Sequence, residues 1–202
     1  MQELISFLAI LNPFAVALYL RGVMDDLSYR TFARVLAEAC LISLVAFWVF
    51  SVWGEFVLVN LLGVRPASMR IFGGVIFFVV GYNYVMKGYR TMELLRGSLE
   101  ELPSAIALPF MIGAGTLTQS IIIGKRYGAL MSLAILASGM AATFAVVITF
   151  NGLRHSMQGS REAVFDRYVN ILVRINGLVI GAISAEMIVS GVHDLWRPLP
   201  PA

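Results

Sequence analysis

Six long apolar segments, separated by short charged connections, dominate the pattern of hydrophobic and polar positions along the chain. The segments are Leu4–Leu20, Leu36–Trp53, Met69–Met86, Ala105–Ile123, Ala129–Thr149 and Tyr168–Val192. A transmembrane helix needs about 20 predominantly apolar residues, and none of these runs alternates with the period of a barrel strand. The pattern therefore predicts an all-α membrane protein with six transmembrane helices. A shorter apolar stretch, Phe56–Val64, either extends the second helix or lies in the membrane interface.

Composition narrows the classes of protein that fit this pattern. Of the 202 residues, 59% are hydrophobic and 13% are charged, whereas soluble domains carry roughly 25% charged residues. A soluble enzyme, a nucleic-acid-binding module and a disordered chain are therefore excluded. The apolar sequence begins almost at the first residue without a basic region before it, so we interpret the first segment as a retained span rather than a signal peptide.

The basic residues indicate the orientation in the membrane. Five of the fifteen Lys and Arg residues lie on one predicted side, namely Arg65, Arg70, Lys125, Arg126 and Arg197. The other ten lie in or beside the connections after the first, third and fifth segments. Because cytoplasmic loops carry an excess of Lys and Arg, both termini are predicted to lie on the outer side.

Matching motifs recur in the two halves of the chain. Ala9–Phe14 aligns with Ala105–Phe110 at a shift of 96 residues, and Arg70–Ile76 aligns with Arg174–Ile180 at a shift of 104. Chance similarity between apolar helices could produce either match alone. Two matches in the same order favour an internal repeat.

This repeat divides a single integral membrane domain into residues 1–96 and 97–202, each with three predicted helices. Because three crossings reverse the direction of the chain, the second repeat would enter the membrane the other way up. Inverted-topology repeats are typical of secondary transporters.

Helix-breaking residues occur at corresponding places in the two repeats, in the first and fourth helices. Pro13 follows Asn12 in the first segment, and Pro109 precedes Gly113 and Gly115 in the fourth. Broken helices are tolerated in a membrane where the freed backbone groups are buried in protein or line a cavity, and paired breaks are the best sequence indication of a transporter site. Their orphan N–H and C=O groups match the carboxylate and ammonium of a zwitterionic amino acid. Proline kinks and small-residue packing are the structural alternative.

Polar and small residues near the breaks are the candidate functional residues. The predicted substrate-binding residues are Asn12, Pro13, Gly113, Gly115, Thr116, Thr118 and Asn176. The residues assigned to hinges or close helix packing are Gly73, Gly74, Pro109 and Gly177. Glu186, inside the last segment, is a candidate for proton or ion coupling, and an ion pair with Arg65 or Arg70 is its structural alternative.

The sequence contains no recognisable catalytic or cofactor motif. Its two histidines, His155 and His193, are far apart, and with a single cysteine they make no plausible metal set. Neither a nucleophile elbow nor a phosphate-binding loop is present. We therefore expect no enzyme activity, no metal and no cofactor.

Four motifs carry a resemblance to a known family. They are Asn12-Pro13, Gly54 followed by Leu61–Gly74, the stretch Pro109–Thr118, and Gly177 with Ser190-Gly191-Val192. Together they cover nearly the whole chain and resemble the MarC family of multi-span inner-membrane proteins, which includes the SnatA-type small neutral amino acid transporters. The resemblance implies an inner-membrane exporter of small neutral amino acids such as alanine, glycine or threonine.

The chain departs from the family pattern at both breaks. Ala15 and Leu18 stand where the family usually has a glycine and a second proline, and Ala114 stands where it has the proline of a Gly-Pro-Gly motif. We expect the small amino acid and the lipid bilayer as partners, with alternating access around a midplane site. The exact substrate, the coupling ion, the direction of transport and the oligomeric state stay open. A non-transporting assembly protein and an ion channel or carrier of another substrate class are the alternatives.

Overall fold

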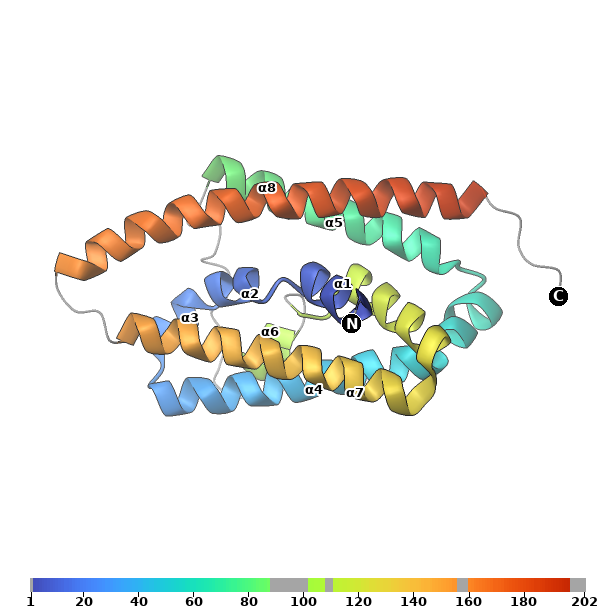
Figure 1. Ribbon diagram of the computed structural model, residues 1–202, viewed down its shortest axis with the longest axis horizontal. Coiled ribbons are helices and arrows are strands. Elements are labelled where there is room, and N and C mark those ends of the chain that lie inside the picture. Colours follow the sequence, from blue (N-terminus) through green and yellow to red (C-terminus); the bar gives the residue numbers. More distant parts are fainter. Residues whose placement is uncertain (1, 88–101, 108–110, 156–159, 197–202) are drawn as a thin grey trace.

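The computed structural model describes residues 2–87, 102–107, 111–155 and 160–196 (Figure 1). Within these ranges every regular element is a helix. The elements are α1 (Gln2–Leu11), α2 (Pro13–Tyr19), α3 (Arg21–Asp26), α4 (Tyr29–Glu55), the π-helix η1 (Phe56–Leu61), α5 (Pro66–Lys87), α6 (Leu102–Ile106), α7 (Ala114–His155) and α8 (Ser160–Trp196).

Several of these helices are long and apolar enough to cross a membrane. In the described ranges, five stretches qualify: Gln2–Asp26, Tyr29–Leu61, Pro66–Met86, Ala114–Arg154 and Tyr168–Trp196. Large apolar side chains such as Phe72, Leu130 and Leu178 are exposed on the outer surface, which suits lipid rather than water. The prediction of an all-helical chain with several membrane-crossing helices is confirmed.

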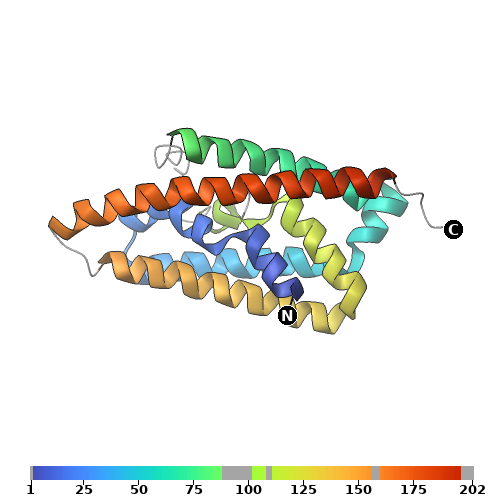
Figure 2. The ribbon, with the colours of Figure 1, turned by 45° about the horizontal axis from the view of Figure 1, so that its top comes forward.

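The fourth and fifth predicted segments meet at a kink in α7. The element contains one non-helical residue, Gly128, with φ 75° and ψ 175°, which divides it into two helices, as the two predicted segments required. Figure 2 shows the yellow first arm of α7 meeting the golden second arm at a sharp bend. We call residues 114–127 the first arm and residues 129–155 the second arm. Glycine permits this bend because it adopts a positive φ without steric cost.

The segment predicted over Ala105–Ile123 is thus divided between α6 and the first arm of α7. Residues 107–113 lie between these two helices, and 108–110 are outside the described residues. The first arm alone is too short to cross a membrane, because a crossing needs about 20 helical residues.

The uncertain stretch after the second segment continues that helix. Glu55 and Phe56 both have right-handed helical backbone angles, so η1 follows α4 without a break. Leu62 ends the element, and Gly63 then takes a positive φ of 64°. Phe56–Val64 therefore extends the second helix as far as Leu61.

The helices form two packed groups with the short elements between them (Figure 1). α5 lies along α8 on one side, and α4 lies along α7 on the other. One apolar cluster, which includes Phe7 and Phe47 in an edge-to-face pair, joins α1, α2, α4, α6 and α7. A second cluster joins α2 to α5 and α8 through residues such as Leu18 and Tyr84. Since α2 contributes to both clusters, the helix that begins after Asn12 lies between the two groups.

Candidate functional site

The first helix break is a single residue, Asn12. Its backbone is left-handed, with φ 49° and ψ 74°, and it is the one non-glycine residue with a positive φ in the described part of the chain. Asparagine tolerates this conformation better than most residues because its side chain bonds locally. Here Oδ1 of Asn12 accepts the N–H of Ala15 at 3.0 Å and caps α2. Pro13 occupies the first helical position, where its fixed φ and missing N–H suit a helix start.

The break also frees a backbone acceptor. Pro13 has no N–H group, so the carbonyl of Ala9 loses the donor that a regular helix would supply. The sequence Asn-Pro thus accounts locally for the end of α1 and the start of α2.

An amide hydrogen bond connects this break to the last helix. Nδ2 of Asn12 donates to Oδ1 of Asn176 at 3.0 Å, across 164 residues of sequence. Because Oδ1 of Asn12 already accepts from Ala15, its nitrogen must face α8, and the atom of Asn176 that meets it must be the oxygen. Two predicted binding residues are therefore in contact, and the orientation of both amides is set.

This orientation leaves the amide nitrogen of Asn176 without a partner in the part of the chain that the structure describes. Asn176 is 8% exposed, and its Nδ2 makes no hydrogen bond within the described residues. A buried donor that is left unpaired costs about 1–3 kcal/mol. An acceptor from a ligand or a water molecule would remove that cost.

The buried face of α8 reaches from the first break to the second. Asn176, Ile180, Ser184 and Met187 lie along it at helical spacing and are all buried. Oγ of Ser184 also has no hydrogen-bond partner within the described residues. The methyl group of Met187 lies 2.7 Å from the position that a Cβ on Gly115 would take. One helix face thus carries two unpaired polar groups and contacts both breaks.

Hydroxyl groups at the second break bond to their own backbone. Oγ1 of Thr116 accepts the N–H of Gly113 at 2.9 Å and lies 3.0 Å from the carbonyl of Met111, to which it can donate. Oγ1 of Thr118 donates to the carbonyl of Ala114 at 2.7 Å. A substrate role for Thr116 and Thr118 stays a prediction, and both hydroxyls are engaged locally in this structure.

The glycines assigned to packing stand at close helix contacts. A Cβ on Gly73 would lie 2.7 Å from the backbone nitrogen of Gly115, and one on Gly74 would lie 3.0 Å from the carbonyl oxygen of Ser184. A Cβ on Gly177 would lie 2.8 Å from Cβ of Tyr84. These contacts hold α5 against the start of α7 and against α8. Pro109 lies outside the described residues.

Glu186 does not make the ion pair considered as its alternative role. Arg70 pairs with Asp194 at 2.8 Å, and Arg65 donates to the carbonyl of Leu195 at 3.0 Å. Asp194 lies two helical turns beyond Glu186 on α8, where the start of α5 meets the end of α8. Glu186 itself is exposed, and its coupling role stays a prediction.

Sequence reasoning missed a polar cluster formed by the buried side chains of Glu3 and Gln119 and the exposed side chain of Arg126. Oε2 of Glu3 accepts from Nε2 of Gln119 at 2.9 Å, and Oε1 pairs with Nη1 of Arg126 at 2.6 Å. The available signal was a carboxylate in the first turn of an apolar segment. Nothing in the sequence indicated its partners, which lie more than 110 residues away.

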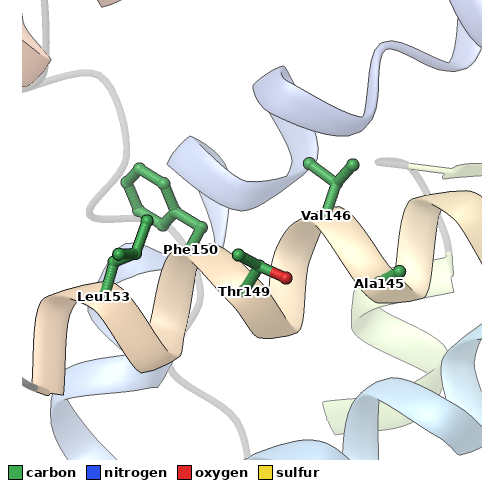
Figure 3. Close-up of a pocket in the computed structure, with 5 residues that line it drawn as sticks. All are labelled: Ala145, Val146, Thr149, Phe150 and Leu153. Carbon is green, nitrogen blue, oxygen red and sulfur yellow. The ribbon is translucent and has the colours of Figure 1, made fainter.

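An open groove lies on the second arm of α7 (Figure 3). It measures about 330 Å³ and is lined by Ala145, Val146, Thr149, Phe150 and Leu153. Phe150 packs edge-on against Phe14 of α2 with 6.3 Å between ring centroids. The lining contains none of the predicted binding residues. Across the described part of the chain, no group of three His, Cys, Asp or Glu side chains could hold a metal ion.

Comparison with known proteins finds one family and several relatives that match over nearly the whole chain. Residues 1–196 match a family model described as MarC family integral membrane protein. Similar proteins include a UPF0056 membrane protein of Aquifex aeolicus, 22% identical over 97% of this chain and 93% of the relative. The UPF0056 membrane protein MJ1677 of Methanocaldococcus jannaschii is 25% identical, with 93% of each chain covered. The UPF0056 membrane protein YhcE of Escherichia coli is 24% identical, with 96% of this chain and 92% of the relative covered. No solved structure matches the chain.

Proposed function

Because the chain belongs to the MarC family of integral membrane proteins, we propose that it is a secondary transporter of small neutral amino acids such as alanine, glycine or threonine. It crosses the inner membrane as two inverted three-helix repeats, residues 1–96 and 97–202, with both termini outside. The substrate binds at the midplane, near the two helix breaks, and access alternates as one repeat moves against the other.

The arrangement of the helices supports this scheme. If α6 with the first arm of α7 counts as the fourth span and the second arm as the fifth, the interruption at Asn12 and the one between α6 and α7 occupy equivalent spans. The α5–α8 packing then joins the third span to the sixth, and α4 packs on α7, where Nε1 of Trp48 donates to the carbonyl of Ala129 on the second arm. The second and third spans thus pack on their counterparts in the other repeat, an arrangement compatible with two inverted repeats.

The Asn12–Asn176 hydrogen bond is the observation that carries the proposal. This bond leaves the N–H groups of Asn176 available to an acceptor such as a substrate carboxylate. Because Pro13 has no N–H group, the carbonyl of Ala9 is available to a donor such as an ammonium group. Asn12, Asn176 and Ser184 carry no charge, and the buried carboxylate of Glu3 is already paired with Arg126. A site without net charge favours a zwitterion over an ion.

Transport into proteoliposomes tests the proposal, with radiolabelled alanine, glycine and threonine as substrates. We expect saturable transport of at least one of them. Asn176→Ala should lower the transport rate at least about tenfold, because a substrate loses the hydrogen bonds of a buried amide. Asn83→Ala is the matched control, since the amide of Asn83 only donates to the carbonyl of Val79 on its own helix.

Two results would contradict the proposal in different ways. Folded protein that transports none of the three amino acids would show that the substrate class is wrong. Normal transport by Asn176→Ala would show that the site is wrong.

A non-transporting assembly protein is the second candidate, and the close packing around Gly73 and Gly115 favours it. It predicts no saturable flux for any substrate, while a channel predicts flux that does not saturate. The same proteoliposomes therefore distinguish all three classes.

A further inference from the structure

The cluster of Glu3, Gln119 and Arg126 joins the segments that lie on one side of the two breaks. Glu3 is on α1, which leads into the first break, and Gln119 and Arg126 are on the first arm of α7, which leads out of the second. Gln119 and Arg126 are seven residues apart, two helical turns, so both face the same neighbour. One carboxylate therefore bridges two half-helices from different repeats.

The position of Glu3 relates the cluster directly to the predicted site. The buried residues of α1 are Glu3, Phe7 and Leu11, which form one face of the helix and lead down to Asn12. Phe7 on this face packs against Phe47 of α4 and lies close to Gly139 on the second arm of α7, while Ile10 lies close to Gly115 on the first arm. Glu3 therefore holds the end of α1 that is farther from Asn12 to the first arm of α7.

Four ion pairs of Lys or Arg in the described residues cross between the repeats, but only one has a buried acid. The pairs are Glu3–Arg126, Glu55–Lys125, Arg70–Asp194 and Asp25–Arg154. The side chains of Asp25, Glu55 and Asp194 are at least 40% exposed, whereas that of Glu3 is 10% exposed. Exposed pairs contribute little, while breaking a pair that has a buried charge is costly.

We propose that Glu3, Gln119 and Arg126 form a gate that holds α1 and the first arm of α7 together and opens when the site opens to the side where the chain begins. This inference rests on the proposed transport function. The side chain of Arg126 is 61% exposed, so on release it moves into water while Glu3 and Gln119 separate with their helices. The three residues thus control access rather than bind the substrate.

Cysteine labelling measures the opening directly, because the chain contains a single cysteine, Cys40, which is buried on α4. Leu11→Cys in a Cys40→Ala background places a thiol below the gate, and a membrane-impermeant maleimide reports its access. E3Q should raise the labelling rate roughly tenfold, because it removes a charge-assisted bond while keeping the shape of the side chain. R126Q should do the same, and E3Q/R126Q should add little to either. Should E3Q fail to fold, R126Q gives the same measurement.

E55Q is the matched control, because it removes the acid of the neighbouring exposed pair with Lys125. We expect its labelling rate to stay within about twofold of the parent. In protein that retains Cys40, E3Q should leave that thiol unlabelled. Labelling of Cys40 would show general loosening rather than a gate, and an unchanged rate at Leu11→Cys would likewise overturn the proposal.

The labelling experiment is independent of flux. Normal amino acid transport without a labelling change contradicts the gate and leaves the transport function standing. Faster labelling in protein that transports nothing supports the gated passage and contradicts the substrate assignment.

Discussion

The two helix breaks occupy corresponding places in the halves of the chain but satisfy their polar groups in opposite ways. At the first, the side chain of Asn12 bonds to Ala15 and to Asn176 on a distant helix, and the amide nitrogen of Asn176 has no partner among the described residues. At the second, the hydroxyl of Thr116 bonds back to its own segment, and Gly73 packs against the backbone of Gly115.

The difference follows from side-chain chemistry. A threonine or serine hydroxyl can donate to a carbonyl one turn back on its own helix, as Thr118 does to Ala114 and Ser120 does to Thr116. An asparagine amide has two donors and an oxygen with two lone pairs, more than one turn of helix satisfies. In apolar surroundings, amides are therefore the groups that recognise other segments or ligands, while hydroxyls at a break mostly stabilise it.

The largest effect is expected at Asn12. Asn12→Ala removes the cap of α2, the bond to Asn176 and the side chain that tolerates a left-handed backbone. We expect a loss of about 2–3 kcal/mol in the free energy of unfolding, from the left-handed conformation and the lost cap together. Asn12→Gly restores the backbone freedom and should recover about 1–2 kcal/mol of that loss. Denaturant unfolding in detergent measures both variants.

Transport measurements distinguish the role of Asn12 in stabilising the helix break from its role in orienting Asn176. Both variants should lose transport to the same extent, since neither can orient Asn176. If Asn12→Gly transported at the parent rate, the hydrogen bond between the side chains of Asn12 and Asn176 would be only structural. The two breaks would then not differ in function.

A smaller effect is expected from the packing at the second break. Gly73→Ala places a methyl group 2.7 Å from a backbone nitrogen, and such overpacking typically costs about 1–3 kcal/mol. Gly181→Ala is the control, because a Cβ there meets nothing within 4 Å. It should be neutral or stabilising, as alanine favours helix. Equal thermal stability of the two variants would mean that α5 does not need this close approach.

The smallest effects are expected at the two threonines. Thr116→Ala removes the bond to Gly113 and should cost about 1 kcal/mol, whereas Thr118→Ala should stay within about 0.5 kcal/mol of the parent. The double variant should keep at least about half of the parent transport rate, because both hydroxyls serve their own backbone. A tenfold loss of initial transport rate would instead establish them as substrate ligands and make the breaks alike.

Much of the fold could be predicted because it depends on local properties. Apolar runs of membrane-spanning length and the Asn12-Pro13 pair indicated several helices and the position of the first break. The kink at Gly128 separates the fourth and fifth segments as predicted, but the bounds of the fourth were harder to predict, because α6 ends at Ile106 and α7 begins only at Ala114. The extension of α4 into η1 depends on a π-helical turn that the apolar pattern does not distinguish.

The candidate site was predictable in its parts but not in its contacts. Asn12 and Asn176 were selected separately as polar residues in apolar segments, and their contact required the packing of α2 against α8. The cluster at Glu3 could not be predicted, because the sequence does not distinguish a buried carboxylate near a helix end from an exposed one.

Hydrophobicity, helix-breaking residues and family motifs are properties of the chain itself, so the sequence determined that this is an all-helical MarC-family membrane protein with a break at Asn12-Pro13. Burial and pairing depend on which helix faces lie together, so only the tertiary structure decided that Asn12 orients Asn176, that Thr116 bonds to its own backbone, and that Glu3 is buried against Arg126. The role of a buried polar side chain depends on its hydrogen-bond partners, and for Asn12 and Glu3 those partners lie more than a hundred residues away.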